Sequence, residues 1–167
     1  MPRRPTPLAQ IRLLVLDVDG VLTDGRLRYG PDGERDKVFH VRDGHGIKAL
    51  AAAGVTVAVI SGRESAAVAR RCEELGIREL QQGAADKALA LAALTARLGL
   101  AARECACVGD DTPDLPMMRH AGLAVAVADA HAAVRRAAHR RTRLGGGAGA
   151  VREVCDWLLS ARAGTRG

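Results

Sequence analysis

The 167-residue sequence has very few aromatic residues, since Trp157, Tyr29 and Phe39 are the complete set. A hydrophobic core must therefore be built from Ala, Val, Leu and Ile. The chain also offers hardly any flat rings on which the bases of a single-stranded nucleic acid could stack. At this length it fits one domain, which can bury a core without help from disulfide bonds.

Cysteine is scarce as well, and its spacing argues against a thiolate metal site. The four cysteines are Cys72, Cys105, Cys107 and Cys155. No two of them have CxxC spacing, and no histidine lies near them at the spacing of a zinc site. We therefore expect four small buried thiols in a reducing compartment.

Long apolar runs are also missing. The first ten residues are basic, and the apolar run that follows them stops at Asp17. It is too short for a signal peptide or a membrane span, so we expect a cytoplasmic protein without a membrane partner.

Lysine is rare although the net charge is +6, because arginine supplies most of the basic residues and the lysines are Lys37, Lys48 and Lys87. The densest basic patch consists of Arg135, Arg136, Arg140, Arg141 and Arg143. A solvated helix face, or a general attraction for anionic small molecules, explains this patch as well as DNA does. We expect no nucleic-acid partner.

Short apolar runs alternate with alanine-rich helical stretches along the chain. The runs at 11–16, 55–60, 105–108 and 123–127 predict buried strands, with a short strand at 78–80. Helices are predicted at 46–53, 65–75, 87–98 and 131–138, three of them followed by the glycines Gly54, Gly76 and Gly99. This alternation predicts an α/β fold with a doubly wound parallel sheet.

One segment interrupts the alternation. Residues 26–29, a Gly-Pro-Asp-Gly turn at 30–33 and residues 37–41 predict a β-hairpin, inserted at 24–41. We expect an N-terminal extension at 1–10, one domain at 11–161 and a tail at 162–167. Within that domain, a glycine-rich segment beginning at 145 separates the body from a final helix that ends at 161.

Polar clusters follow several of the predicted strands. Asp17 and Asp19 come directly after the first strand, and Ser61-Gly62-Arg63 follows the second. Asp86-Lys87 opens a helix, and Gly109-Asp110-Asp111 follows a further strand, with Asp114 just beyond. Each cluster alone is an ordinary turn, loop or helix cap. Together they fall where the carboxyl ends of parallel strands would form one crevice.

The chemistry of this combination points to phosphoryl transfer. Carboxylates gathered in one crevice repel each other unless a cation neutralises them, and hard oxygen ligands of this kind suit Mg²⁺. A carboxylate beside that ion can attack phosphorus, and a second one two residues on can serve as general acid and base. Ser61 and Lys87 would hold the phosphoryl oxygens, where charge builds in the transition state.

The motifs DVDGVLTD, ISGR, Lys87 and GDDTPD resemble, in order, those of the haloacid dehalogenase superfamily of aspartyl-phosphate phosphatases. The resemblance extends from Ile11 to Leu159 and implies a capless, Rossmann-like fold. It implies Asp17 as nucleophile, Asp19 as general acid and base, and Ser61 and Lys87 as phosphate ligands. It places Mg²⁺ on the Asp17 side chain, the Asp19 backbone carbonyl and Asp110. Asp114 resembles a supporting acid, and Asp111 receives no role.

A narrower set of motifs resembles the capless 3-deoxy-D-manno-octulosonate 8-phosphate phosphatases: FHVRDGHGIK, GIRELQQGAADK, VADAH and GAVREVCDWLL. This resemblance implies a homotetramer whose hairpins meet, and a place in lipopolysaccharide biosynthesis. It implies that the substrate, a sugar acid phosphate, contacts Asp19, His40, Val41, Arg42, Asp43, Gly44, Lys48, Arg63, Arg71 and Lys87. Ala148 departs from the family pattern, which has a basic residue there, so the resemblance does not assign a substrate contact to this segment.

Two alternatives remain open at this point. A phosphatase of a related nine-carbon sugar acid 9-phosphate would use the same residues, although Arg63 argues against it, because that group tends to carry an acidic residue there. A non-catalytic, phosphatase-like assembly module is the other, and the presence of Asp17, Asp19, Lys87 and Asp110 argues against it.

Overall fold

The computed structural model describes residues 4–164. Residues 1–3 of the predicted N-terminal extension and residues 165–167 of the predicted tail lie outside the described part. A six-stranded sheet forms the centre, with strand order β5-β4-β1-β6-β7-β8 and parallel pairing throughout. The strands are β1 (Leu13–Leu16), β4 (Thr56–Ile60), β5 (Glu79–Gln81), β6 (Cys105–Gly109), β7 (Leu123–Ala126) and β8 (Arg140–Arg141). The predicted doubly wound parallel sheet is confirmed.

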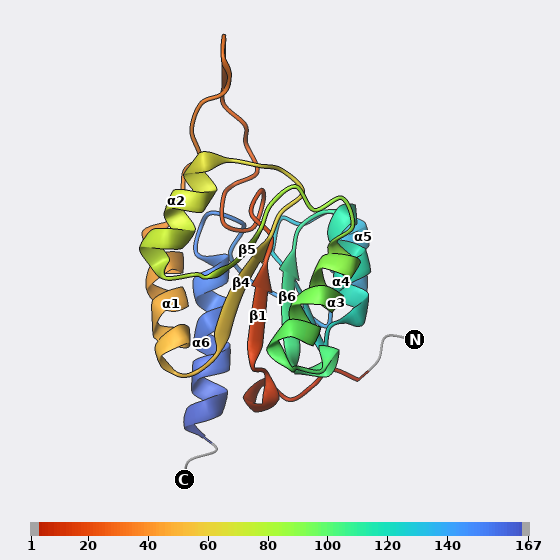
Figure 1. Cartoon of the computed structure of the whole chain (residues 1–167). Coiled ribbons are helices and arrows are strands. Elements are labelled where there is room, and N and C mark those ends of the chain that lie inside the picture. The colour runs from red at the N-terminus through yellow and green to blue at the C-terminus, as the bar shows by residue number, and fades with distance from the viewer. Residues whose placement is uncertain (1–3, 165–167) are drawn as a thin grey trace.

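Helices cover both faces of the sheet (Figure 1). One face carries α1 (Val41–Ala52), α2 (Ala66–Leu75) and α6 (Ala150–Ala163), and the other carries α3 (Lys87–Leu98), α4 (Leu115–His120) and α5 (Ala132–Ala137). The described residues also form short 3₁₀ helices: η1 (Leu8–Gln10), η2 (Ala102–Glu104) and η3 (Thr112–Asp114). The ends of α3 follow from its sequence. The Asp86 carboxylate accepts hydrogen bonds from the N–H groups of Ala88 and Leu89, and Gly99 ends the helix with a φ of 64°.

The core is aliphatic, as the composition predicts. All four residues of β1 are fully buried, because this strand lies between β4 and β6 with helices on both faces. Phe39 and Trp157 pack only at the margin of the core, and Tyr29 is 63% exposed. The four cysteines are buried and unpaired, as expected, and burial raises the pKa of their thiols above the ordinary value.

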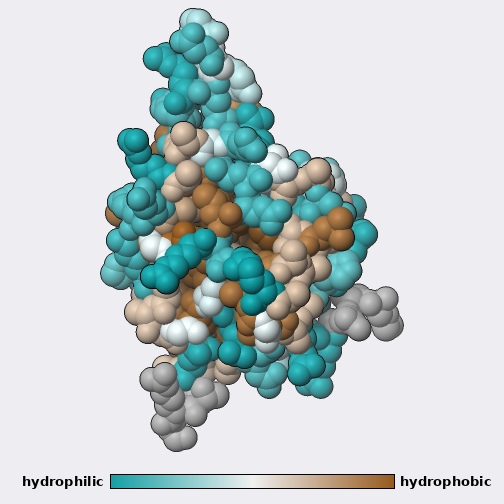
Figure 2. Space-filling model, viewed as in Figure 1, coloured by the Kyte–Doolittle hydropathy of each residue, from teal (hydrophilic) through white to brown (hydrophobic). Residues whose placement is uncertain are grey.

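The predicted hairpin is present, but it is shorter than expected. β2 (Tyr29–Gly30) and β3 (Gly33–Glu34) form a two-stranded antiparallel ladder, which projects from the body in Figures 1 and 2. The predicted second strand at 37–41 is wrong. The chain returns to the body there because the Lys37 side chain bonds to Asp19 and Phe39 packs against the core. Val41 then begins α1, five residues earlier than the predicted helix start at 46.

Two further elements lacked a clear sequence signal. α4 is a six-residue helix with a proline at its second position, and β8 is a two-residue edge strand made of two exposed arginines. Both are too short to show periodicity. Among residues 4–164, the helices all fall short of the length and apolar character that a bilayer crossing requires.

The glycine-rich segment 145–149, which precedes α6, is packed against the body of the domain. The Gly147 N–H donates to the carbonyl of Val21 at 3.0 Å, and the Gly146 N–H donates to Asp129 Oδ1 at 3.0 Å. A Cβ atom built on Gly146 would lie 1.8 Å from the Gly20 carbonyl oxygen. The segment therefore braces the loop that follows β1, and it requires glycine at this contact.

We expect Gly146→Ala to lower the free energy of unfolding by about 1–3 kcal/mol, because two backbone segments must move apart to admit the methyl group. Urea denaturation measures the change. Gly164→Ala is the matched control, since its added Cβ would meet its nearest neighbour at 3.8 Å, and we expect a change within about 0.5 kcal/mol. Equal stability of the two variants would contradict the tight contact with the β1 loop.

Candidate active site

The polar clusters predicted to share a crevice do meet at one edge of the sheet. β1 pairs with β4 on one side and with β6 on the other, so the loops after these three strands are neighbours. Asp17 follows β1, Ser61 follows β4 and Asp110 follows β6. All of these strands are parallel, and their carboxyl ends therefore place the three side chains on the same side of the molecule.

Three carboxylates form a compact cluster at this edge of the sheet. Asp17, Asp110 and Asp114 each offer one oxygen atom within 4.8 Å of the others. The Lys87 ammonium lies against two of them, 2.7 Å from Asp17 Oδ1 and 2.6 Å from Asp114 Oδ1. Lys87 is the first residue of α3, so the helix start that Asp86 caps also delivers this ammonium group to the cluster.

Asp114 shapes the loop that carries Asp110. Its Oδ2 accepts hydrogen bonds from the N–H groups of Asp110 at 2.9 Å and Asp111 at 3.3 Å, and its side chain is 1% exposed. This arrangement supports the interpretation of Asp114 as a supporting acid. Asp111, for which the sequence indicates no role, accepts a hydrogen bond from the Thr112 N–H at 2.7 Å and so caps η3.

The electrostatics of the cluster fit a divalent cation. Burial, and then the charge of Asp114, raise the pKa of Asp17 to about 6, although Lys87 opposes this shift. Burial, followed by the charges of Asp17, Asp114 and Asp111, raises the pKa of Asp110 to about 8. Three carboxylates face one ammonium group, so the site holds excess negative charge when all are ionised. Oxygen ligands with such a charge excess suit Mg²⁺.

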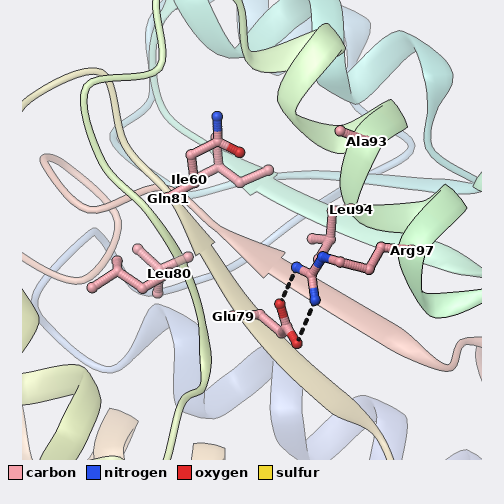
Figure 3. Close-up of a pocket in the computed structure, with 8 residues that line it drawn as sticks. Ile60, Glu79, Leu80, Gln81, Ala93, Leu94 and Arg97 are labelled. Carbon is pink, nitrogen blue, oxygen red and sulfur yellow. Dashed lines mark hydrogen bonds and ion pairs between the residues drawn. The ribbon is translucent and has the colours of Figure 1, made fainter.

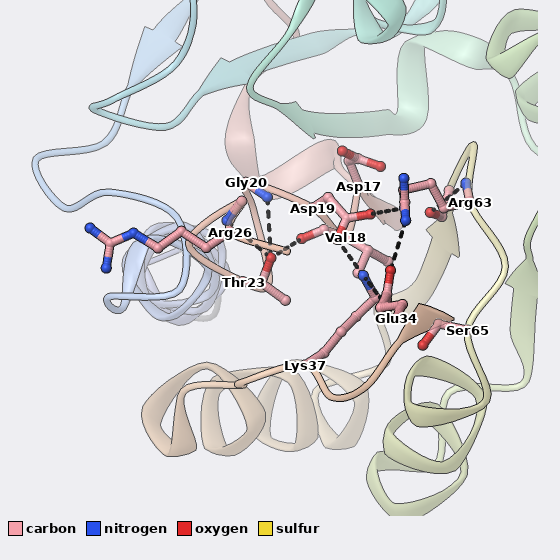
Figure 4. A network of polar contacts seen from close by, with 12 residues as sticks. Asp17, Val18, Asp19, Gly20, Thr23, Arg26, Glu34, Lys37, Arg63 and Ser65 are labelled. Carbon is pink, nitrogen blue, oxygen red and sulfur yellow. Dashed lines mark hydrogen bonds and ion pairs between the residues drawn. The ribbon is translucent and has the colours of Figure 1, made fainter. Parts of the chain in front are cut away.

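The Asp19 side chain contacts Lys37, beyond the hairpin ladder, and Arg63, in the turn after β4 (Figure 4). Its Oδ1 accepts a hydrogen bond from Lys37 at 2.6 Å, and its Oδ2 lies 3.7 Å from Arg63 Nε. Arg63 in turn donates to Glu34 at 2.8 Å and to the hydroxyl of Tyr29 at 3.0 Å.

Sequence reasoning did not identify Lys37 and Glu34 as site residues. One signal was available: Lys37 is one of three lysines in a chain whose other cations are arginines. Its partner, however, lies 18 positions earlier, and the fold of the intervening hairpin brings the two together.

Ser61 occupies the position that the sequence predicts. It is buried directly after β4, and its N–H and carbonyl are held by Gln81 and Ala84. Its hydroxyl oxygen accepts a hydrogen bond from the Arg63 N–H at 3.3 Å. The turn after β4 that presents Ser61 therefore also fixes the backbone position of Arg63.

The other predicted substrate contacts gather at the start of α1. The Nδ1 atom of His40 caps the helix by accepting from the Arg42 N–H at 3.2 Å, and Val41 and Arg42 are exposed. Gly44 allows the Arg71 guanidinium to approach, since a Cβ there would lie 2.4 Å from it. Lys48 is exposed one turn further along the helix.

Asp43 differs from its neighbours, because it turns towards α6. Its Oδ1 accepts a hydrogen bond from the N–H of Arg152 at 2.8 Å, in the first turn of that helix. The N-terminal residue before α6 is Gly149, which has no side chain to cap it. Asp43 thus caps α6 from another helix, and burial raises its pKa.

A separate cavity of about 420 Å³ lies away from these residues, between the edge of the sheet and α3 (Figure 3). Its walls include the apolar side chains of Ile60 and Leu94 and an ion pair between Glu79 and Arg97. A brown hollow is visible in the middle of the face shown in Figure 2. None of the predicted site residues line this cavity.

Comparisons with known proteins agree with the geometry. A family model described as haloacid dehalogenase-like hydrolase matches residues 76–144. The 3-deoxy-D-manno-octulosonate 8-phosphate phosphatase of Escherichia coli strain K12 is 50% identical over 152 residues, covering 91% of this chain and 81% of that protein. The crystal structure of the Yersinia pestis phosphatase of the same name has a TM-score of 0.92 at 47% identity, covering 96% of this chain and 86% of that one.

A third structure contains ligands. The 3-deoxy-D-manno-octulosonate 8-phosphate phosphatase of Moraxella catarrhalis was crystallised with a magnesium ion, a phosphate ion and a KDO molecule. Its TM-score is 0.91 at 43% identity, and the match covers 95% of this chain and 91% of that one. On this likeness in sequence and in structure, the chain belongs to the 3-deoxy-D-manno-octulosonate 8-phosphate phosphatase family of haloacid dehalogenase-like hydrolases.

Proposed function

We propose that this protein hydrolyses 3-deoxy-D-manno-octulosonate 8-phosphate to the free sugar acid and phosphate, with Mg²⁺ as cofactor and an aspartyl-phosphate intermediate. The observation that carries the proposal is the buried cluster in which Lys87 bridges Asp17 and Asp114 beside Asp110. The relatives of that name support the choice of substrate. The product, 3-deoxy-D-manno-octulosonate (KDO), places the reaction in lipopolysaccharide biosynthesis.

The reaction would proceed by two successive displacements at phosphorus, and Asp17 and Asp19 take part in both. The Asp17 carboxylate attacks phosphorus, the bond from phosphorus to the sugar oxygen breaks, and Asp19 donates a proton to that leaving oxygen. Asp19 then takes a proton from water as the water oxygen attacks phosphorus and the Asp17 carboxylate is released. Lys87 orients Asp17 and, together with Ser61, offers donors to the phosphoryl oxygens.

Asp17, Asp110 and the backbone carbonyl of Asp19 would hold Mg²⁺, and Asp114 lies close enough to support it. When bound, the ion supplies positive charge that offsets the clustered carboxylates and the phosphoryl oxygens. The raised pKa values of Asp17 and Asp110 support this assignment, because they report buried negative charge that Lys87 alone does not balance.

The far end of the substrate carries a carboxylate, for which the start of α1 and the neighbouring helix α2 provide partners. Arg71 lies beside Gly44 and 5.9 Å from the centre of the Phe39 ring, and its side chain is 19% exposed. A half-buried guanidinium can bind a carboxylate with two parallel hydrogen bonds. His40, Val41, Arg42, Lys48 and Arg63 are the other proposed contacts. Asp43 contributes indirectly, by holding α6 against α1.

The hairpin supports a homotetramer as the working assembly. Leu27, Tyr29 and Val38 are 41%, 63% and 62% exposed on it, and Val41 at its base is 77% exposed. A two-stranded ribbon is marginal by itself and gains stability when another surface covers it. Pairing with the hairpins of other subunits in a closed symmetry would bury these side chains. The four unpaired thiols suit the cytoplasm, which we propose as the location.

We expect purified protein to release phosphate from 3-deoxy-D-manno-octulosonate 8-phosphate when Mg²⁺ is present, and to lose this activity in excess EDTA. Asp17→Asn should reduce turnover by at least about 10³-fold while the circular dichroism spectrum is unchanged, because an amide is a poor nucleophile. A colorimetric phosphate assay measures both effects. Comparable wild-type efficiency on glucose 6-phosphate would contradict the substrate, and an active Asp17→Asn protein without deamidation would contradict the mechanism.

Arg71→Ala should lower kcat/KM for the sugar acid phosphate about ten- to a hundredfold, since one charge-assisted pair with the substrate carboxylate is lost. Activity on an aryl phosphate, which has no such carboxylate, should change little. Arg70→Ala is the matched control, because Arg70 is the exposed neighbour on α2. Equal losses on both substrates in the Arg71 variant would assign Arg71 a structural role.

Multi-angle light scattering at micromolar concentration should give the mass of four chains. Replacing Tyr29 and Val38 with serine should shift the mass towards that of a single chain, because both side chains lie exposed on the proposed contact surface. A monomer mass for the unaltered protein would rule this assembly out.

A further inference from the structure

Asp19 is held by a cation from the hairpin, outside the parallel sheet. The Lys37 ammonium donates to Asp19 Oδ1 at 2.6 Å and lies 2.9 Å from Glu34 Oε1, and its side chain is 2% exposed. A lysine is rarely buried this far unless carboxylates neutralise it. Lys37 therefore has a fixed position relative to the loop after β1 (Figure 4).

Glu34 and Arg63 close the contact into a ring of four side chains. Glu34 Oε2 accepts a hydrogen bond from Arg63 at 2.8 Å, while its other oxygen faces Lys37. Arg63 Nε completes the ring 3.7 Å from Asp19 Oδ2. The ring joins the hairpin to the turns after β1 and β4, so each of its members is constrained by two others.

The two oxygens of Asp19 are therefore not equivalent. Oδ1 is engaged by Lys37 in a short charge-assisted hydrogen bond, whereas Oδ2 lies beyond hydrogen-bond distance of Arg63. A general base must present one oxygen to the proton that it takes, and an aspartate without a partner can rotate away from this orientation. Lys37 leaves Oδ2 as the oxygen that can receive a proton.

We propose that Lys37 is a positioning residue for the reaction, holding Asp19 so that Oδ2 takes the proton of the water that attacks the aspartyl phosphate. The inference rests on the phosphatase function proposed above. In this step a bond forms between the water oxygen and phosphorus, and the bond between phosphorus and Asp17 breaks. One water proton passes to Asp19 Oδ2, and Lys37 keeps all of its own protons.

Lys37→Met tests the proposal, because methionine keeps the length of the side chain and removes the donor. An aryl phosphate is the substrate, since its leaving group needs no proton for the first displacement. We expect kcat/KM, which reports that displacement, to stay within about threefold. The steady-state kcat should fall about ten- to a hundredfold, because hydrolysis of the aspartyl phosphate becomes limiting.

Accumulation of phosphoenzyme gives a direct readout that a loosened fold would not produce. Acid-quenched samples of the Lys37 variant should show a phosphorylated fraction by intact mass, with a burst of aryl alcohol equal to the number of sites. Wild-type protein under the same conditions should show less of both. Equal losses in kcat and kcat/KM without phosphoenzyme would overturn the proposal and make Lys37 an anchor of the hairpin.

Two further variants separate the possible outcomes. Asp36→Asn removes a 3.7 Å ion pair with Arg28 in the same hairpin and should leave both kinetic parameters unchanged. Glu34→Gln keeps Lys37 but removes the charge of one of its partners. It should shift kcat and kcat/KM in the same direction as Lys37→Met. Glu34→Gln therefore still tests the proposal if the Lys37→Met protein fails to fold. An effect of Asp36→Asn as large as that of Glu34→Gln would overturn the proposal. Wild-type protein without phosphatase activity would instead overturn the function on which it rests.

Discussion

The buried ammonium of Lys87 is the interaction on which the rest of the site depends. It bridges Asp17 after β1 and Asp114 after β6, and it comes from the first residue of α3. The ion pairs of this one ammonium group thus hold together the loop after β1, the loop after β6 and the start of α3, which are distant in sequence. Removing Lys87 would leave the buried carboxylates without their compensating charge, which is far more costly than never having formed the pair. Asp114 also positions Asp110, because its second oxygen accepts hydrogen bonds from the N–H groups of Asp110 and Asp111.

Close backbone approach is the second constraint on this edge of the sheet. A Cβ on Gly20 would lie 2.1 Å from Asp110, and one on Gly109 would lie 2.6 Å from Asp114. Gly146 also packs closely against the backbone of Gly20, in the loop after β1. The carboxylates can gather this tightly because glycine backbone, rather than side chains, fills the space around them. The small residues of the motifs are thus as necessary to the cluster as the aspartates.

Sequence reasoning predicted five of the six strands of the sheet, five of the six α-helices of residues 4–164 at least in part, and the common edge at which Asp17, Ser61, Lys87 and Asp110 lie. These predictions succeed because apolar runs and helix caps are local signals, and because parallel strands bring their carboxyl ends together. The path by which residues 37–41 return from the hairpin to the body of the domain could not be predicted in the same way. This path depends on a contact between Lys37 and Asp19 that has no local pattern. The role of Asp43 as a cap of α6 also has no local pattern, because its hydrogen bond with the Arg152 N–H spans 109 positions.

The scarcity of lysine gives the protein an unusual chemical property. Lys37 and Lys87 have side chains that are 2% and 7% exposed, each against two carboxylates, whereas Lys48 is exposed. Among the lysine side chains, an acylating reagent therefore has one open target in the folded protein. Acylation of Lys37 requires that the hairpin lift from the body and uncover this side chain. Mass spectrometry of the Lys37 peptide after brief acylation thus reports openings of the hairpin, with the Lys48 peptide as the internal standard.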